Sequence, residues 1–188
     1  MTYRTHKIHL VRRIRNVFLA LVLLSTISRP AVASLCGMES LPKSVQSALR
    51  TSYANWQVVT TDMLSAEDRK IWTKEYAAGC PGIAKGDYTG TLGEYALNLL
   101  KTVDGQHYQQ VLVVSIEDKS LRWFTVLAPM RVGTVSVITR VPPGNYQDAE
   151  RVKSAASKHD SVALITFEAG TVQYYWSGSR FRSITTSE

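Results

Sequence analysis

The residues best suited to binding are three consecutive aromatics near the end of the chain, Tyr174, Tyr175 and Trp176. A Ser-Gly-Ser turn separates them from two arginines, Arg180 and Arg182. Side chains alternate along a strand, so Tyr174 and Trp176 share one face while Tyr175 points to the other. Tyr, Trp and Arg are enriched at protein interfaces, so the pattern predicts a binding surface that the two arginines rim. An alternative stays open, in which the aromatics only pack on the core.

Catalytic patterns are absent from the sequence. Hydrolysis by a serine or cysteine needs a base within reach, but His107 and His159 both fall in polar turns. Nucleophile elbows, zinc-ligand spacings and phosphate-binding glycine loops do not occur. The acidic pairs 67–68 and 117–118 fall at a helix start and in a turn, where acidic residues are locally favoured. We therefore predict no catalytic residue and no cofactor. A hydrolase of envelope material, with carboxylates that converge from distant segments, remains an alternative.

The first 33 residues have the three regions of a secretory signal peptide. A basic stretch without acidic residues precedes an apolar run at 17–24, and Ala31-Val32-Ala33 supplies the small residues of a cleavage site. A membrane-spanning helix needs about 20 apolar residues, and this run is shorter before Arg29 interrupts it. We expect cleavage between Ala33 and Ser34, no transmembrane anchor afterwards, and a periplasmic or secreted protein.

The signal peptide also accounts for the net charge. The chain has 22 basic and 15 acidic residues, and six of the basic residues lie in 1–33, which leaves 22 − 6 = 16 basic against 15 acidic residues. A high isoelectric point otherwise suggests nucleic acid as a partner. Because the excess belongs to the targeting segment, we expect no nucleic-acid partner.

The part after residue 33 has two cysteines, Cys36 and Cys80, and neither lies in a Cys-x-x-Cys motif. In an oxidising compartment two such residues most simply form one disulfide. A nucleophilic thiol is the alternative.

Hydrophobic periodicity predicts an α+β fold in a single domain over 34–188. Its core is one antiparallel sheet of about six to seven strands, mostly hairpins, because the gaps between β-rich runs are short. Expected helices lie at 42–53, 66–77 and 147–157. A short strand is expected at 56–60, and the strands of the sheet at 94–103, 108–117, 121–127, 132–141, 161–168, 171–176 and 180–185.

The segment CPGIAKGDYTGTLGEYALNLL, residues 80–100, resembles the repeat of FG-GAP and VCBS proteins. In that family an acidic, glycine-containing turn often binds calcium through several oxygen ligands. The resemblance places Asp87 at the first acidic position and Glu94 at the last, after a one-residue deletion. Thr89 and Thr91 stand where Asp or Asn is expected. Only one such segment occurs, so the chain is not a propeller of these repeats.

The C-terminal GTVQYYWSGSRFRSITTSE, together with the same segment, is similar to small exported bacterial proteins. That grouping implies a compartment and an architecture but no activity.

These observations predict an exported, non-enzymatic protein that binds another protein or a cell-envelope component. An inhibitor or immunity-like role is one form of this function. The alternatives are the envelope hydrolase and a degenerate calcium-binding module with Asp87 and Glu94 as its ligands.

Overall fold

The structure is a computed structural model and describes residues 36–76, 79–118 and 120–187. The chain divides after Ala33, and every described residue belongs to the unit Ser34–Glu188. The predicted signal peptide and its cleavage between Ala33 and Ser34 therefore lie outside the described residues. Within the described ranges, no helix combines the length and apolar character needed to cross a membrane.

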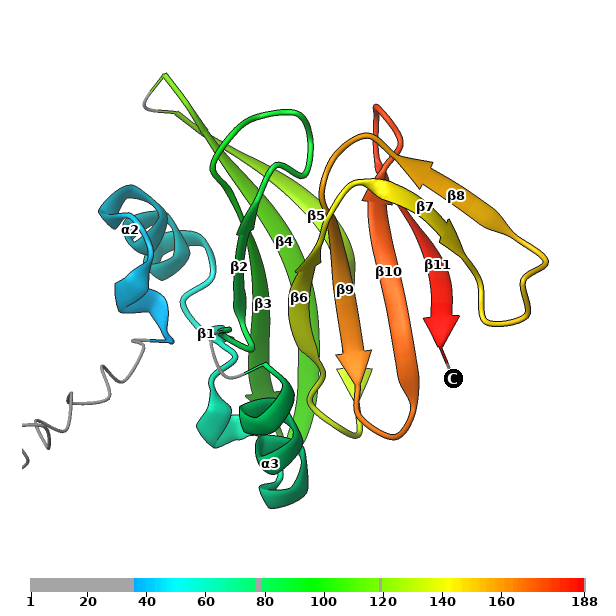
Figure 1. Cartoon of the computed structure of the whole chain (residues 1–188). Coiled ribbons are helices and arrows are strands. Elements are labelled where there is room, and N and C mark those ends of the chain that lie inside the picture. Colours follow the sequence, from blue (N-terminus) through cyan, green and yellow to red (C-terminus); the bar gives the residue numbers. More distant parts are fainter. Residues whose placement is uncertain (1–35, 77–78, 119, 188) are drawn as a thin grey trace, which may run out of the picture. The chain divides into compact units, whose positions relative to one another are not determined.

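Strands dominate the described chain (Figure 1). The helices are α2 (Lys43–Ser52) and α3 (Ala66–Glu75), with short 3-10 turns η1 (Met38–Ser40) and η2 (Thr61–Met63). The strands of the first half are β1 (Gln57–Val58), β2 (Ile83–Gly86), β3 (Glu94–Val103), β4 (Gln106–Glu117) and β5 (Ser120–Val132). Those of the second half are β6 (Val137–Val141), β7 (Gly144–Gln147), β8 (Ser154–Ser157), β9 (Ser161–Thr166), β10 (Gly170–Trp176) and β11 (Phe181–Ser187).

All strand pairs are antiparallel, and they form two sheets and a separate hairpin. In the first sheet β1 and β2 both pair with β3, which continues to β4 and β5. The second sheet has the order β11-β10-β9-β6, and β7 pairs only with β8. The predicted α+β class with antiparallel strands is confirmed, but the predicted single sheet is wrong, because the described strands form two sheets and a hairpin. The predicted number of strands is wrong, because the described residues form eleven strands rather than six to seven.

The helices begin where the sequence indicates. Ser65 caps α3, and its hydroxyl accepts a hydrogen bond from the backbone N–H of Asp68 at 3.0 Å. Helix α2 follows Pro42 and buries Val45 and Leu49 against the outer face of the first sheet. This packing fixes which face of β3 and β4 points away from the second sheet.

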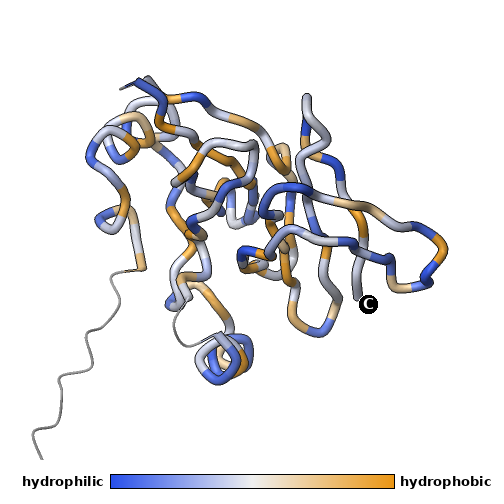
Figure 2. The backbone as a smooth tube through the Cα atoms, turned by 45° about the horizontal axis from the view of Figure 1, so that its top comes forward, coloured by the Kyte–Doolittle hydropathy of each residue, from blue (hydrophilic) through white to orange (hydrophobic). Residues whose placement is uncertain are grey.

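The two sheets pack against each other through alternate residues. Ala96 of β3 and Val113 of β4 meet Ile138 of β6 and Val162 of β9 in one buried cluster. The most continuous hydrophobic stretches lie on these strands, whereas the β7–β8 hairpin is mainly hydrophilic (Figure 2). Helix α3 adds Trp72 to a further cluster with Val137 of β6.

A buried amide network joins the sheets at one point. The Gln109 Nε2 donates to Asn98 Oδ1 at 2.7 Å and to the Ser136 carbonyl at 3.0 Å, and Gln109 Oε1 accepts from Ser136 N at 3.1 Å. Asn98 and Gln109 are fully buried, so each must be hydrogen-bonded. The network holds the segment between β5 and β6 against the first sheet.

The predicted helix at 147–157 is wrong. Those residues form the end of β7, a turn, and β8. The turn is closed by bonds from Arg151 N to the Asp148 carbonyl and from Asp148 N to the Lys153 carbonyl, both 3.0 Å. Arg151 has φ of 60°, in the left-handed region that a helix excludes.

Strand β5 is longer than predicted and runs through Pro129 to Val132. Proline is tolerated because β5 is an edge strand, and its register with β4 is irregular between the Val111–Leu127 and Gln109–Met130 pairs. The chain then leaves the first sheet, so the expected strand at 132–141 is only β6, in the second sheet.

The disulfide between Cys36 and Cys80 is present, as predicted. It links the beginning of the described chain to the segment that leads from α3 into β2.

Candidate functional site

Tyr174 and Trp176 lie on the face of β10 that points toward β5. Trp176 makes edge contacts with Phe124 of β5, at 5.4 Å between ring centroids, and with Phe181 of β11, at 5.2 Å. Tyr174 packs on the core between the sheets, and this burial raises the pKa of its hydroxyl. All four side chains remain partly exposed. We call Phe124, Tyr174, Trp176 and Phe181 the aromatic surface.

Tyr175 lies on the opposite face of the hairpin. It lines a groove of about 500 Å³ between β10–β11 and the 148–153 turn, which Ala149 N fastens to the Thr185 carbonyl at 3.0 Å. Arg182 is its cross-strand neighbour, and Arg180 is exposed in the turn. The two arginines therefore do not rim one patch as expected: Arg182 shares the face of Tyr175, not that of Trp176.

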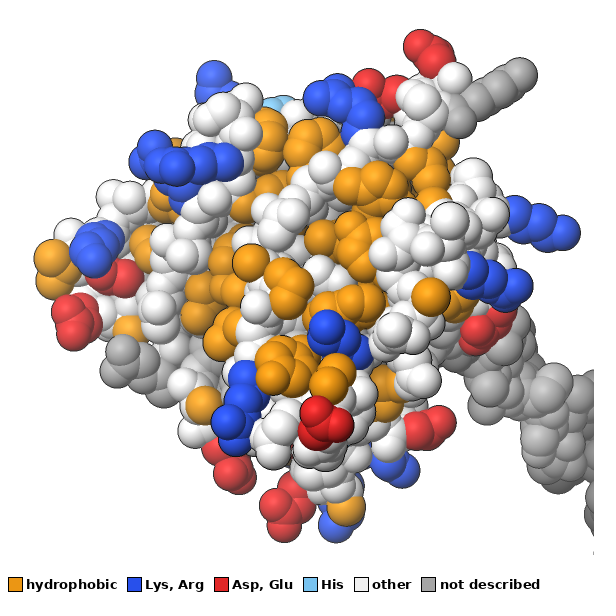
Figure 3. Space-filling view, turned by 180° about the vertical axis from the view of Figure 1, so that it is seen from behind, with side chains coloured by type: hydrophobic (Ala, Val, Ile, Leu, Met, Phe, Trp, Pro, Cys, Tyr) orange, Lys and Arg blue, Asp and Glu red, His pale blue; other side chains and the backbone are white. Residues whose placement is uncertain are grey.

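The charge on these strands has one sign. Residues 120–132 and 170–187 contain four arginines and no acidic residue. Arg122 pairs with Glu117 at 3.2 Å, whereas Arg131, Arg180 and Arg182 have no ion pair within the described chain. Seen from behind, the molecule carries a broad hydrophobic area with both basic and acidic side chains around it (Figure 3). β5 and the β10–β11 hairpin are thus both apolar and basic, whereas the groove on the Tyr175 side also has Asp148 and Glu150 in its lining.

Asp87 and Glu94, at the two ends of the segment between β2 and β3, have separate partners. Glu94 is fully buried, and its carboxylate accepts from the backbone N–H groups of Tyr88 and Thr89 at 2.6 and 2.7 Å and from the Thr89 hydroxyl at 2.5 Å. Asp87 instead accepts from Gly90 N at 2.9 Å and lies 3.7 Å from His159. In the described ranges no three His, Cys, Asp or Glu side chains are grouped to hold a metal ion.

The remaining polar candidates have local partners. His107 Nδ1 lies 3.0 Å from Thr102 Oγ1 on an exposed cross-strand pair. The Ser177 hydroxyl donates to the Arg180 carbonyl at 2.8 Å within the hairpin turn. Phe124 and Phe181 were missed as site residues from the sequence. Alternation in the 120–127 run could have marked Phe124, but nothing local shows that β5 meets β10.

Glu117 provides a pH-dependent contact at the end of β4. The hydrogen bond from Arg122 holds the pKa of this carboxyl below its ordinary value of 4.5, and the Thr91 and Ser115 hydroxyls add to the effect. A carboxyl with a lowered folded-state pKa stabilises the fold above its unfolded pKa, and this contribution is lost as the pH falls through the folded value. An NMR titration should therefore place the Glu117 pKa below 4.5, and Arg122→Leu should raise it.

The matched control is Arg131→Leu, which removes an arginine of the same strand that does not bond Glu117. A Glu117 pKa at its ordinary value in the native protein, or one that Arg122→Leu leaves unmoved, would contradict the assignment.

Comparison with known proteins finds no match for this chain among protein-family models, curated proteins or solved structures.

Proposed function

We propose that this protein is exported and acts as a non-enzymatic binding protein, whose partner is an acidic protein that docks on the β10–β11 hairpin and the adjoining aromatic surface. The observation that carries the proposal is Trp176, which lies partly exposed between Phe124 and Phe181 on strands whose only charges are arginines. Aromatic anchors beside arginines supply most of the free energy at many interfaces.

The chemistry of the surface favours a protein over other envelope components. β5 pairs only with β4, so it leaves one edge of backbone groups unpaired in the described fold, whereas the Thr185 carbonyl of β11 accepts from Ala149 N. Such an edge accepts an extended segment of a partner through main-chain hydrogen bonds. Arg131, Arg180 and Arg182 then select acidic partners and speed their association.

Affinity capture from envelope extracts with the 34–188 chain tests the proposal. We expect a captured acidic protein that Trp176→Ala weakens at least tenfold, because the central aromatic anchor is lost. Arg180→Glu with Arg182→Glu should also abolish capture, and raised salt should weaken it. Tyr175→Ala reports whether the second face of the hairpin takes part.

Leu92→Ala is the matched control, since Leu92 is 87% exposed and lies in the loop before β3, outside the hairpin. Circular dichroism establishes that each variant is folded. Capture that survives both the tryptophan and the arginine changes would contradict the proposal, as would equal loss in Leu92→Ala.

A further inference from the structure

Two unpaired strand edges face each other on another part of the molecule. β2 pairs only with β3, and β6 only with β9. One end of the seam between β2 and β6 is closed by a hydrogen bond from Ile138 N to the Pro81 carbonyl at 2.9 Å. At the other end Asp160 N donates to the Asp87 carbonyl at 2.8 Å. Main-chain pairing does not close the seam between these points.

A pocket of about 700 Å³ lies over this seam, beside α3. Its apolar lining comes from both strands and the helix: Trp72, Tyr76, Ile83, Ala84 and Ile138. Trp72 is buried and stacks on Tyr76 at 4.9 Å between ring centroids, so the partly exposed Tyr76 forms an aromatic wall of the pocket that Trp72 supports. This volume and lining are those of a small-molecule site.

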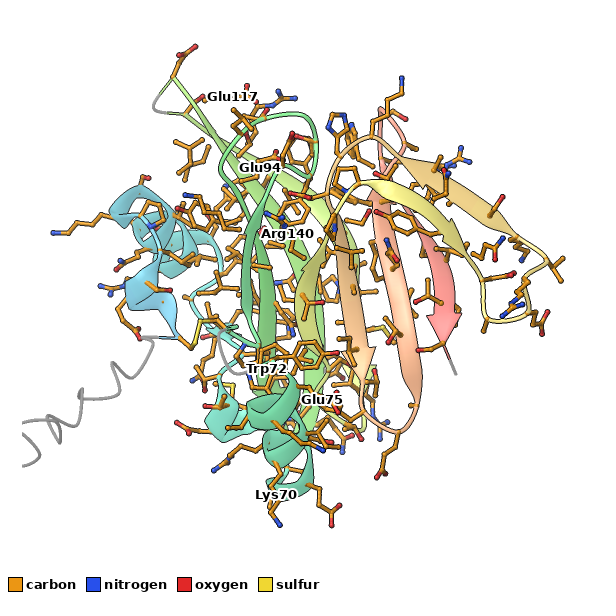
Figure 4. All side chains as sticks on the ribbon, in the orientation of Figure 1. Lys70, Trp72, Glu75, Glu94, Glu117 and Arg140 are labelled. Carbon is orange, nitrogen blue, oxygen red and sulfur yellow. A yellow bond between two sulfur atoms is a disulfide. The ribbon has the colours of Figure 1, made fainter. Side chains whose placement is uncertain are left out.

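The polar groups of the pocket are mainly cationic. Lys74, Lys85 and Arg140 line it with one carboxylate, Glu75. Lys85 and Arg140 also line an adjoining pocket of about 300 Å³, so they stand where the two spaces meet. Figure 4 shows Arg140 above Trp72 along the line between β2 and β6.

The carboxylates of the adjoining pocket are already engaged. Asp160 accepts from Asp87 N at 2.8 Å, and Asp87 accepts from Gly90 N at 2.9 Å. Arg140 Nε is 3.6 Å from Asp160, and half of the arginine side chain is exposed. Lys85 has no ion pair in the described chain; its Nζ lies over the Tyr95 ring, 5.8 Å from the centroid, so the ammonium group at the mouth of the apolar pocket has no carboxylate partner.

We infer that this pocket binds a single-chain anionic amphiphile, with its hydrocarbon chain against the partly exposed Tyr76, Ile83 and Ala84 and its anionic group on Lys85 and Arg140. An apolar chain removes the lining from water, which contributes roughly 0.8 kcal/mol for each CH₂ group buried. The cations at the mouth favour a negative head group over a neutral or positive one. This site is independent of the aromatic surface and of the partner proposed for it.

Dodecanoate below its micellar concentration is the probe, and isothermal titration calorimetry with the 34–188 chain is the measurement. We expect saturable one-to-one binding and a rise in melting temperature. Dodecanol should bind more weakly, and dodecyltrimethylammonium at least tenfold more weakly. Lys85→Gln should weaken dodecanoate about tenfold without affecting dodecanol.

Two further variants make the test decisive. Thr139→Trp fills the pocket from its wall and should abolish binding of all three probes in a folded protein. Lys70→Gln removes a lysine of α3 that points away from β2 and β6 (Figure 4) and should leave every affinity unchanged. Equal affinity for the anionic and cationic probes, no effect of Lys85→Gln or Thr139→Trp, or a lowered melting temperature on addition of dodecanoate would overturn the inference.

The arginine variants of the hairpin separate this site from the proposed function. Arg180→Glu with Arg182→Glu should abolish protein capture and leave dodecanoate binding intact. Loss of dodecanoate binding in that variant would contradict the placement of the ligand between β2 and β6.

Discussion

Replacing Glu94 by alanine is expected to lower the free energy of unfolding by about 3–4 kcal/mol. Each hydrogen bond to a charged group contributes about 1.5–3 kcal/mol, and a buried donor left without an acceptor costs about 1–3 kcal/mol. The carboxylate is fully buried and accepts three hydrogen bonds from Tyr88 and Thr89. Alanine leaves the buried N–H of Tyr88 without its acceptor. Urea denaturation followed by circular dichroism measures the loss.

Glu94→Gln is the sharp control for this effect. An amide oxygen in the place of Oε2 still accepts from both backbone N–H groups, and the amide nitrogen donates to the Thr89 hydroxyl. Only the charge is lost, so we expect a cost of about 1 kcal/mol. Asp87→Ala, in the same loop but partly exposed, should cost less than Glu94→Ala.

The effect of calcium on stability distinguishes the structural role of Glu94 from the calcium-binding role that the FG-GAP resemblance implies. If Glu94 serves the loop only as an acceptor, calcium and EDTA should leave the melting temperature of the native protein unchanged. A calcium-dependent rise that Glu94→Ala removes would contradict this interpretation and restore the calcium-binding module.

Elements with a strong local signal were predicted close to their true bounds. β3, β4 and β10 are β-branched or aromatic runs between turns, and α3 has a serine cap with an acidic residue three positions on. For such segments local preference and tertiary packing favour the same structure.

The misses occur where tertiary context outweighs the local pattern. β2 is Ile-Ala-Lys-Gly, which has little strand preference of its own and is held by pairing with β3. The 147–157 segment has alanine and valine at helical spacing, yet it folds as a hairpin arm anchored through Ala149 N on β11. A hydrogen bond to a strand that is distant in the sequence cannot be predicted from the local residue pattern.

In the candidate site, too, the features set by local sequence were predicted and those set by tertiary contacts were not. Alternation along β10 correctly separated Tyr175 from Tyr174 and Trp176. It gave no information on the strand that lies opposite each face, so the contact of Trp176 with Phe124, some 50 residues away in the chain, could not be predicted. The pocket between β2 and β6 was missed for this reason too, since its walls come from three separate segments.

Removing the disulfide should have an effect of similar size to Glu94→Ala but of different origin. Cys36 and Cys80 are 44 residues apart, and closing a loop of that length restricts the unfolded chain by about 4 kcal/mol in the chain-entropy model. The loop contains α2, whose Val45 and Leu49 pack on β3 and β4, so the bond also retains this helix on its sheet. We expect Cys36→Ala with Cys80→Ala to lower the free energy of unfolding by about 3–4 kcal/mol.

A reducing agent provides the matched control for the double variant. It should lower the stability of the native protein to that of the variant and leave the variant itself unchanged, because no other cysteine exists. A further stability loss in the reduced variant would mean that the agent acts elsewhere.

The size of the loss tells how the bond stabilises the fold. A loss below about 1 kcal/mol would show that the 36–80 loop is already restricted in the unfolded chain, so that breaking the bond releases less conformational entropy than the model assumes. In that case the disulfide would do no more than hold the segment around Cys36, and hydrogen exchange would increase only in the turn before α2. A loss of the expected size, with faster exchange throughout α2, would instead show that the bond secures the packing of that helix on the first sheet.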